Sequence, residues 1–112
     1  MTMKIERQEM TEFVTVATAG EIAPGERLIV EIGRHWVAVF NVDGTYYALR
    51  DVCTHDGGPL AEGELCGHEI ECPRHGARFD LRTGAVTAPP AVRPAPVYEV
   101  RVVGDEIQVE VR

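Results

Sequence analysis

Apolar residues recur at every second position along most of the chain, a pattern typical of strands with one buried face. Six segments carry it: 13–17, 27–32, 35–42, 45–52, 97–103 and 106–111. They are rich in Val, Ile, Tyr, Phe and Thr, which suit a pleated, half-buried surface. In the last segment Ile107, Val109 and Val111 share one face, and polar residues occupy the other. The pattern predicts a chain built mainly of strands, with a further short strand around Phe79 and Leu81.

Turn signals stand between these segments. Asp43-Gly44 separates two apolar runs and Gly104-Asp105 separates the last two, and these residue types tolerate the positive φ angles of tight hairpins. Ala23-Pro24-Gly25 and Gly33-Arg34 mark further turns. Short strands joined by such turns predict an all-β fold, arranged as a small antiparallel sandwich or barrel.

The remaining segments are less regular. Residues 4–12 form the one stretch with a weak helical pattern, and residues 1–11 are expected to be a loosely ordered N-terminal extension because Met1–Met10 is polar. The proline-rich residues 88–96 predict a stiff, extended segment without ladder hydrogen bonds. Trp36, the single tryptophan, is expected in the core. Because no repeat or linker is visible, residues 1–112 are expected to form a single domain.

The composition excludes several classes of protein. With 112 residues, 45% of them apolar and 26% charged, the chain has the size and composition of one globular domain. Its formal charge of −7 disfavours nucleic-acid phosphates as a partner. No apolar run approaches the roughly 18 residues of a membrane helix, and the polar N-terminus lacks a signal-peptide pattern, so we expect no membrane association and a cytoplasmic location. Three cysteines in that reducing compartment indicate metal or redox chemistry rather than a disulfide scaffold.

Two short motifs combine cysteine with histidine. Cys53-Thr54-His55 is followed, after the sixteen residues 56–71, by Cys72-Pro73-Arg74-His75. Zinc is the obvious competitor for such ligands. Because each motif supplies one thiolate and one imidazole, the distribution favours a two-iron cluster, with both cysteines on one iron and both histidines on the other. The glycines beside the motifs would let backbone amides approach the sulfurs and donate to them; they are Gly57, Gly58 and Gly76.

The stretches CTHDGGPL and CPRHGARFDLRTG resemble the two cluster-binding boxes of Rieske [2Fe–2S] proteins, and the similarity extends over about residues 14–111. The resemblance implies one [2Fe–2S] cluster per chain. Its ligands would be the thiolates of Cys53 and Cys72 and the imidazoles of His55 and His75.

The resemblance also implies the Rieske fold. This is an all-β fold in which a base of antiparallel strands, a sandwich or barrel, carries an inserted cluster-binding subdomain. In this chain the subdomain would span about residues 51–88. The segment 88–96 is similar to the proline loop that covers the cluster from one side in this family.

Four positions indicate the low-potential branch of the family. High-potential members have cysteines where this chain has Gly58 and Arg74, so the disulfide that ties their loops cannot form here. They also carry a Ser and a Tyr that donate hydrogen bonds to sulfur, where this chain has Ala77 and Phe79. Because each missing donor removes stabilisation of the reduced cluster, we expect a reduction potential at the bottom of the Rieske range, which runs from roughly −150 to +300 mV.

By the same resemblance the chain is a ferredoxin, an electron carrier rather than an enzyme. It would pass single electrons from an NAD(P)H-dependent flavoprotein reductase to the terminal oxygenase of a ring-hydroxylating dioxygenase system, through small, transient contacts. Three alternatives compete with this interpretation. The Rieske domain of an oxygenase catalytic subunit would need a second domain with a two-His-one-carboxylate iron site, for which the chain is too short. The others are the small Rieske-like subunit of nitrite reductase and a zinc-binding interaction module.

Two residues near the motifs have open roles. Cys66 lies outside both motifs, in the expected turn Cys66-Gly67-His68. It is either a tolerated surface thiol or a reactive one that forms a weak metal site with His68 or responds to oxidation. Arg74 lies between two expected ligands, so it is either a solvated side chain or one that tunes the potential and docks an acidic partner surface.

Overall fold

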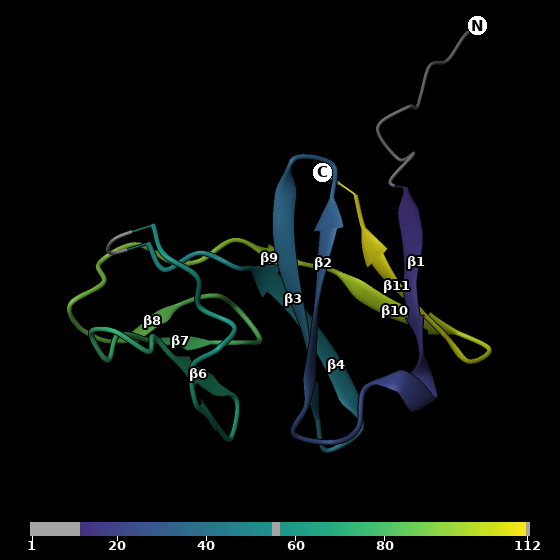
Figure 1. Ribbon diagram of the computed structural model, residues 1–112, viewed down its shortest axis with the longest axis horizontal. Helices are drawn as coiled ribbons and strands as arrows, with labels where there is room; N and C mark the ends of the chain where they lie inside the picture. The colour runs from purple at the N-terminus through teal and green to yellow at the C-terminus, as the bar shows by residue number, and fades with distance from the viewer. Residues whose placement is uncertain (1–11, 55–56, 112) are drawn as a thin grey trace, which may run out of the picture.

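The structure, a computed structural model, describes residues 12–54 and 57–111, and this part of the chain consists mainly of short strands (Figure 1). The strands are β1 Phe13–Thr18, β2 Arg27–Ile32, β3 His35–Val42, β4 Thr45–Arg50, β5 Leu65–Cys66, β6 Glu69–Glu71, β7 Arg78–Asp80, β8 Val86–Ala88, β9 Val97–Tyr98, β10 Val100–Val103 and β11 Glu106–Glu110.

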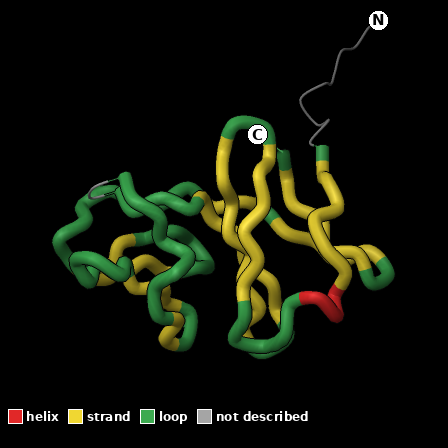
Figure 2. Tube along the Cα trace, in the orientation of Figure 1, coloured by secondary structure: helices red, strands yellow, loops and turns green. Residues whose placement is uncertain are grey.

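Helical structure in the described ranges is limited to one 3₁₀ turn, η2 Ala19–Glu21 (Figure 2). The Glu21 carboxylate accepts a hydrogen bond of 2.8 Å from the Thr18 amide and so caps this turn. Of the helix expected at residues 4–12, all but Glu12 lies outside the described ranges, and Glu12 has no regular structure. None of the described residues forms a helix that is long and apolar enough to span a membrane.

The strands pair into three antiparallel sheets, with the orders β1-β11-β10, β2-β3-β4-β9 and β5-β6-β7-β8. Figure 1 shows the third sheet at one end of the molecule, beside the base that the other two sheets form. The predicted hairpin at Asp43-Gly44 is confirmed: both residues have positive φ, 53° and 91°, and Val42 pairs with Thr45. The predicted all-β fold is therefore confirmed.

The segment 97–103, predicted as one strand, is two strands in two different sheets. Val97–Tyr98 pairs with β4, whereas Val100–Val103 pairs with β11. Between them the Glu99 amide donates to the Glu110 carboxylate over 2.9 Å. The prediction of a single strand was wrong because the change of sheet occurs without any turn-forming residue in the sequence.

Strand β3 separates two hydrophobic cores. Val37 and Val39 pack into the core of the base, whereas Ala38 and Phe40 on the opposite face pack into the core beneath the third sheet. Both faces of β3 are therefore buried, which accounts for the nearly continuous apolar run of this strand.

Trp36 is 55% exposed, so the prediction that it lies in the core was wrong. Strand alternation places it on the same face as Ala38 and Phe40. The core on that face begins only at Ala38, so Trp36 lies beyond its end. The Trp36 carbonyl accepts a hydrogen bond of 2.8 Å from the Asp51 amide.

Arg27 on β2 connects the base to the chain that leads into the third sheet. Its Nη1 donates to the carbonyls of Ala61 and Gly63, each over 2.6 Å. Its guanidinium carbon lies 5.3 Å from the centre of the Phe40 ring. These contacts fix residues 61–63 against the base, and the sequence pattern contained no sign of them.

Candidate metal centre

Cys53 begins a tight loop after β4, here called the first cysteine loop (residues 53–58). The Cys53 amide donates to the Gly58 carbonyl, and the Gly57 amide donates to the Cys53 carbonyl, both over 2.7 Å. Gly57 has a φ of 78°, a left-handed conformation that glycine adopts at little cost. In this loop Cys53 is fully buried.

Cys72 begins a second loop with the same backbone hydrogen bonds, between β6 and β7 (the second cysteine loop, residues 72–77). The Cys72 amide donates to the Ala77 carbonyl over 2.7 Å, and the Gly76 amide donates to the Cys72 carbonyl over 3.0 Å. Gly76 has a φ of 77°, and Cys72 is 1% exposed. The two predicted thiolate ligands thus lie in loops of the same construction.

The predicted histidine ligands differ in how much the structure says of them. His75 is exposed, whereas His55, with its neighbour Asp56, lies outside the described residues. Within the described ranges, no group of three Cys, His, Asp or Glu side chains is placed to hold one metal ion. A two-iron cluster divides its four ligands between two irons, so its ligands need not converge on one point.

The glycines beside the cysteines shape the loops: the amides of Gly57 and Gly76 donate to the carbonyls of Cys53 and Cys72. These glycines therefore close the loops, because a left-handed residue four positions after each cysteine turns the chain back on itself. Donation from the amides of Gly57, Gly58 and Gly76 to sulfur stays a prediction.

The two cysteine loops touch each other through Gly58 and Arg74. The guanidinium of Arg74 occupies the space next to Gly58 in which a side chain of residue 58 would lie. The sequence excluded a disulfide at these two positions, and the structure places them face to face. The other two residues that indicated a low potential, Ala77 and Phe79, are both fully buried.

Asp51 closes the chain around the first cysteine loop, a role that sequence reasoning missed. Its Oδ1 accepts hydrogen bonds from the amides of Leu60 and Ala61, each over 2.7 Å. Leu60 and Ala61 are themselves fully buried. A lone aspartate nine and ten residues before its two partners has no recognisable sequence signal, because the contact depends on the path of the loop.

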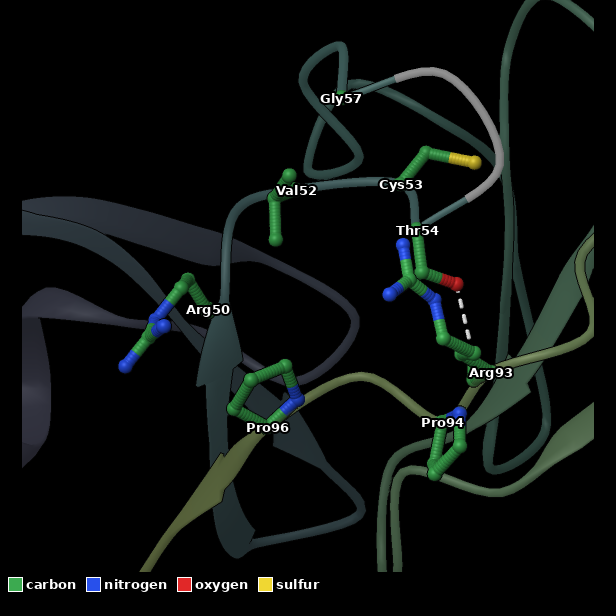
Figure 3. A pocket seen from close by; sticks show the side chains of 8 residues that line it. All are labelled: Arg50, Val52, Cys53, Thr54, Gly57, Arg93, Pro94 and Pro96. Atoms are coloured by element: carbon green, nitrogen blue, oxygen red, sulfur yellow. Dashed lines mark hydrogen bonds between the residues drawn. The ribbon is translucent and has the colours of Figure 1, made fainter.

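The proline-rich segment, residues 88–96, lies against the first cysteine loop. Thr54 Oγ1 donates to the Arg93 carbonyl over 2.6 Å (Figure 3). A cavity of about 520 Å³ lies between the two segments, with Cys53 and Thr54 on one side and Arg93, Pro94 and Pro96 on the other. In Figure 3 the Cys53 thiol points away from Arg50, which also lines this cavity. The expectation that the proline-rich segment covers a cluster stays a prediction.

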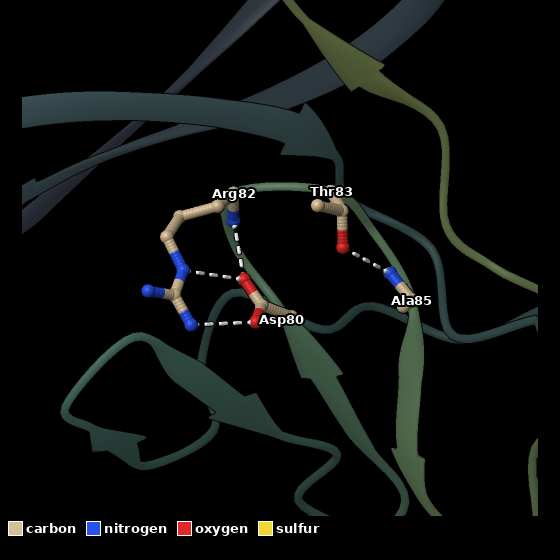
Figure 4. Close-up of polar contacts among 4 residues, drawn as sticks. All are labelled: Asp80, Arg82, Thr83 and Ala85. Atoms are coloured by element: carbon tan, nitrogen blue, oxygen red, sulfur yellow. Dashed lines mark hydrogen bonds and ion pairs between the residues drawn. The ribbon is translucent and has the colours of Figure 1, made fainter.

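Charged side chains on the third sheet are paired with one another. Arg78 Nη2 lies 3.2 Å from Glu71, which directly precedes Cys72, and Arg78 Nη1 lies 3.5 Å from Glu69. Asp80 ends the same strand, and hydrogen bonds from the side chain of Arg82, in the turn that follows, hold the pKa of Asp80 below its ordinary value of 3.8 (Figure 4). The contact between Arg78 and Glu71 offsets acidic charge beside the second cysteine loop.

The third cysteine lies apart from the two loops. Cys66 ends β5 and pairs with Glu69 across the predicted Gly67-His68 turn, which is confirmed. Its thiol is half-buried and forms no disulfide. The His68 ring packs edge-on against Tyr47, with 5.6 Å between ring centres. A metal site or an oxidation-sensitive role for Cys66 stays a prediction.

The donor set fits a [2Fe–2S] cluster of mixed ligation. Cys53 and Cys72 are buried and outside any disulfide, so each thiol is available as a thiolate ligand shielded from water. The exposed His75 would place an imidazole at the protein surface. Two matching loops, each with a thiol inside, are what a cofactor bound from two sides requires.

Residues 12–99 match the Rieske [2Fe-2S] domain family. The chain is 40% identical over 99 residues to the biphenyl dioxygenase ferredoxin subunit of Pseudomonas sp. (strain KKS102), which covers 88% of this chain and 91% of the relative. The solved ferredoxin of carbazole 1,9a-dioxygenase from Nocardioides aromaticivorans IC177 superposes with a TM-score of 0.86 at 38% identity, over 89% of this chain and 98% of that chain. A structure of the complex of reduced oxygenase and oxidized ferredoxin in carbazole 1,9a-dioxygenase contains a chain with a TM-score of 0.83 at 37% identity, over 88% and 92% of the two chains.

Proposed function

The chain belongs to the Rieske [2Fe–2S] domain family and binds a [2Fe–2S] cluster, and from this premise we propose that it is the electron-carrying ferredoxin of a ring-hydroxylating dioxygenase system. When bound, the cluster supplies one-electron redox chemistry. The observation that carries the proposal is the pair of matching loops that bury Cys53 and Cys72 at one end of the molecule. The similarity to ferredoxins over nearly their full length supports it.

We assign the four ligands as Cys53 and Cys72 on one iron and His55 and His75 on the other. The burial of both thiols and the shared construction of the two loops support the cysteines. The exposure of His75 supports a route for electrons through an imidazole at the surface. We assign residues 51–88 as the cluster-binding subdomain of a single domain, because both loops and the third sheet fall within this range.

The proposed partners are a flavoprotein reductase, which supplies electrons from NAD(P)H, and a terminal oxygenase, which receives them. The complex of oxygenase and ferredoxin in the carbazole system supports the second partner. The reductase follows from the chemistry, because a nicotinamide delivers two electrons at once and this carrier holds one, so a flavin must divide the pair. The cytoplasmic location expected from the sequence belongs to the same proposal.

Electron transfer measured in a reconstituted system tests the proposal. The purified protein is mixed with NADH and a catalytic amount of the flavoprotein reductase of a biphenyl dioxygenase system, and the visible spectrum of the cluster is followed. We expect reduction by the reductase, and reoxidation when the terminal oxygenase and its aromatic substrate are added under air. A Cys72→Ala variant is the control without a cluster. A protein that carries the cluster but is neither reduced by any such reductase nor reoxidised by any such oxygenase would contradict the carrier role.

A further inference from the structure

The Arg74 side chain of the second cysteine loop reaches Gly58 of the first. We propose that Arg74 is a positioning residue, which holds the two loops together by packing its guanidinium on Gly58 and whose positive charge raises the reduction potential of the cluster. The inference rests on the proposed ligand set, since its second half needs a cluster between these loops.

The space beside Gly58 carries the argument. A Cβ built on Gly58 would meet Arg74 first: its three nearest atoms all belong to the guanidinium, with Nη1 at 2.6 Å. The backbone of Gly58 does not have a positive φ, so its conformation alone would accept any residue. A side chain at this position would meet the guanidinium, which would have to move to admit it.

Gly57 provides the contrast within the same loop. Its φ is 78°, and a Cβ built on it would meet nothing within 4 Å. A side chain at Gly57 is therefore opposed by the backbone conformation, and one at Gly58 by a neighbouring side chain. A side chain at each of the two adjacent glycines is therefore unfavourable for a different physical reason. Loss of Arg74 should reduce the cost of a substitution at Gly58 but not at Gly57.

The chemistry of arginine suits the contact. A guanidinium is planar and can lie flat against a peptide with no side chain, whereas the lysine ammonium is compact and more strongly hydrated. Arg74 is exposed and lies between the predicted ligands Cys72 and His75, and its guanidinium, against Gly58, carries its charge beside the first cysteine loop. An electron added nearby is stabilised by a fixed positive charge, which shifts the potential upward against the formal charge of −7 of the whole chain.

A double-mutant cycle on the cluster-loaded protein tests the contact. The variants are Gly58→Ala, Arg74→Met and the two combined, with Gly57→Ala alone and combined with Arg74→Met as the matched control. The rate of cluster loss to an iron chelator and the reduction potential are measured for each. Arg74→Lys separates the charge from the planar contact.

We expect Gly58→Ala and Arg74→Met each to speed cluster loss by about fivefold, and the double variant to be no faster than Arg74→Met alone, because both changes remove one contact. Gly57→Ala should add its own effect in full. The potential should fall in Arg74→Met and be partly restored in Arg74→Lys. Additive effects of Gly58→Ala and Arg74→Met on the rate of cluster loss would contradict the proposed contact. An unchanged reduction potential in Arg74→Met would contradict the proposed role of the charge.

The proposed function and this inference can fail separately. If the wild-type protein were to hold no [2Fe–2S] cluster, the proposed function would fail. The same double-mutant cycle would then be measured through the free energy of unfolding of the metal-free protein. Non-additivity at Gly58 and additivity at Gly57 would still support the contact between the loops, and additivity at both would overturn it.

Discussion

Gly57 and Gly76 have almost the same backbone φ, 78° and 77°, in two separate loops. Each is the fourth residue after a cysteine, and each donates its amide proton to the carbonyl of that cysteine, over 2.7 Å and 3.0 Å. The chain therefore builds one loop twice, with a thiol buried in each. The imidazoles break the repeat, because His55 follows its cysteine by two positions and His75 by three.

The ligand assignment predicts the effect of single substitutions. Alanine at Cys53 or Cys72 should abolish the cluster, because a buried loop without its thiolate cannot hold iron. Alanine at His55 or His75 should abolish the cluster or change its EPR spectrum. Iron and acid-labile sulfide contents and the EPR spectrum of the reduced protein are the measurements.

The third cysteine is the matched control for these variants. Cys66→Ser should keep the full iron and sulfide content, because Cys66 lies at a hairpin turn outside both loops. An unaltered cluster in both histidine variants would refute the ligand set, and loss of half the iron in Cys66→Ser would make that residue a ligand.

The reduction potential should lie at the bottom of the Rieske range of roughly −150 to +300 mV. At the two positions where high-potential members of the family carry a hydroxyl, this chain has Ala77 and Phe79, both fully buried. Neither side chain can donate a hydrogen bond to sulfur, so the reduced cluster has less stabilisation. A redox titration near neutral pH measures the potential, and a value near the top of the range would disprove the argument.

A side chain at Gly76 should weaken the second loop. Gly76→Ala forces a φ of 77° on an L-residue and should lower the free energy of unfolding by about 1–2 kcal/mol. Gly67→Ala is the control, because Gly67 has a φ of 61° at a hairpin turn away from both loops. Both variants should lose similar stability in denaturant unfolding, but only Gly76→Ala should release its cluster faster. Equal release rates would mean that the loop geometry does not matter for holding the cluster.

Removing the guanidinium of Arg27 should loosen the residues around 60–64, which connect the base to the third sheet. Arg27→Met keeps the stem but loses the two hydrogen bonds to the carbonyls of Ala61 and Gly63. Because those carbonyls are left without this donor, we expect a loss of about 1–2 kcal/mol in the free energy of unfolding. Hydrogen exchange should rise in residues 60–64. Arg34→Met, at the exposed β2–β3 turn, should change neither quantity, and a similar loss there would show a general effect of arginine removal.

The Asp80–Arg82 pair should make part of the stability depend on pH. Hydrogen bonds from Arg82 lower the pKa of Asp80 below its ordinary value of 3.8. A group whose pKa is lowered on folding stabilises the folded state above its unfolded pKa, and that contribution is lost as the pH falls through the folded-state pKa. The stability difference between wild type and Arg82→Met should therefore shrink below about pH 3.8.

The carboxyl group itself can be followed by NMR titration. The pKa of Asp80 should move up towards 3.8 in Arg82→Met and stay unchanged in Arg101→Met, which removes a guanidinium that lies over the Phe13 ring. An unchanged pKa of Asp80 in Arg82→Met would contradict the pairing.

The strand segments and the cysteine motifs could be predicted from sequence because their signals are local. Alternation over five or six residues marks a strand, and β2 and β3 have the bounds that the pattern predicted. The Asp43-Gly44 hairpin was equally predictable, since these residue types tolerate the positive φ angles of a tight turn. The spacing of Cys53, His55, Cys72 and His75 indicated the cluster without knowledge of the fold.

Features that depend on distant contacts had no such signal. The division of 97–103 at Glu99 follows from which strands lie beside each half, and Trp36 is exposed because the core on its face ends at Ala38. The hydrogen bonds of Asp51 and the position of Arg74 against Gly58 depend on how two loops meet. By itself the sequence determined which segments are extended, where most turns lie and which residues are the candidate ligands, because backbone preference and side-chain chemistry act within a few residues. Only the tertiary structure decided which surfaces are covered and which loops touch, because packing joins residues that the chain keeps far apart.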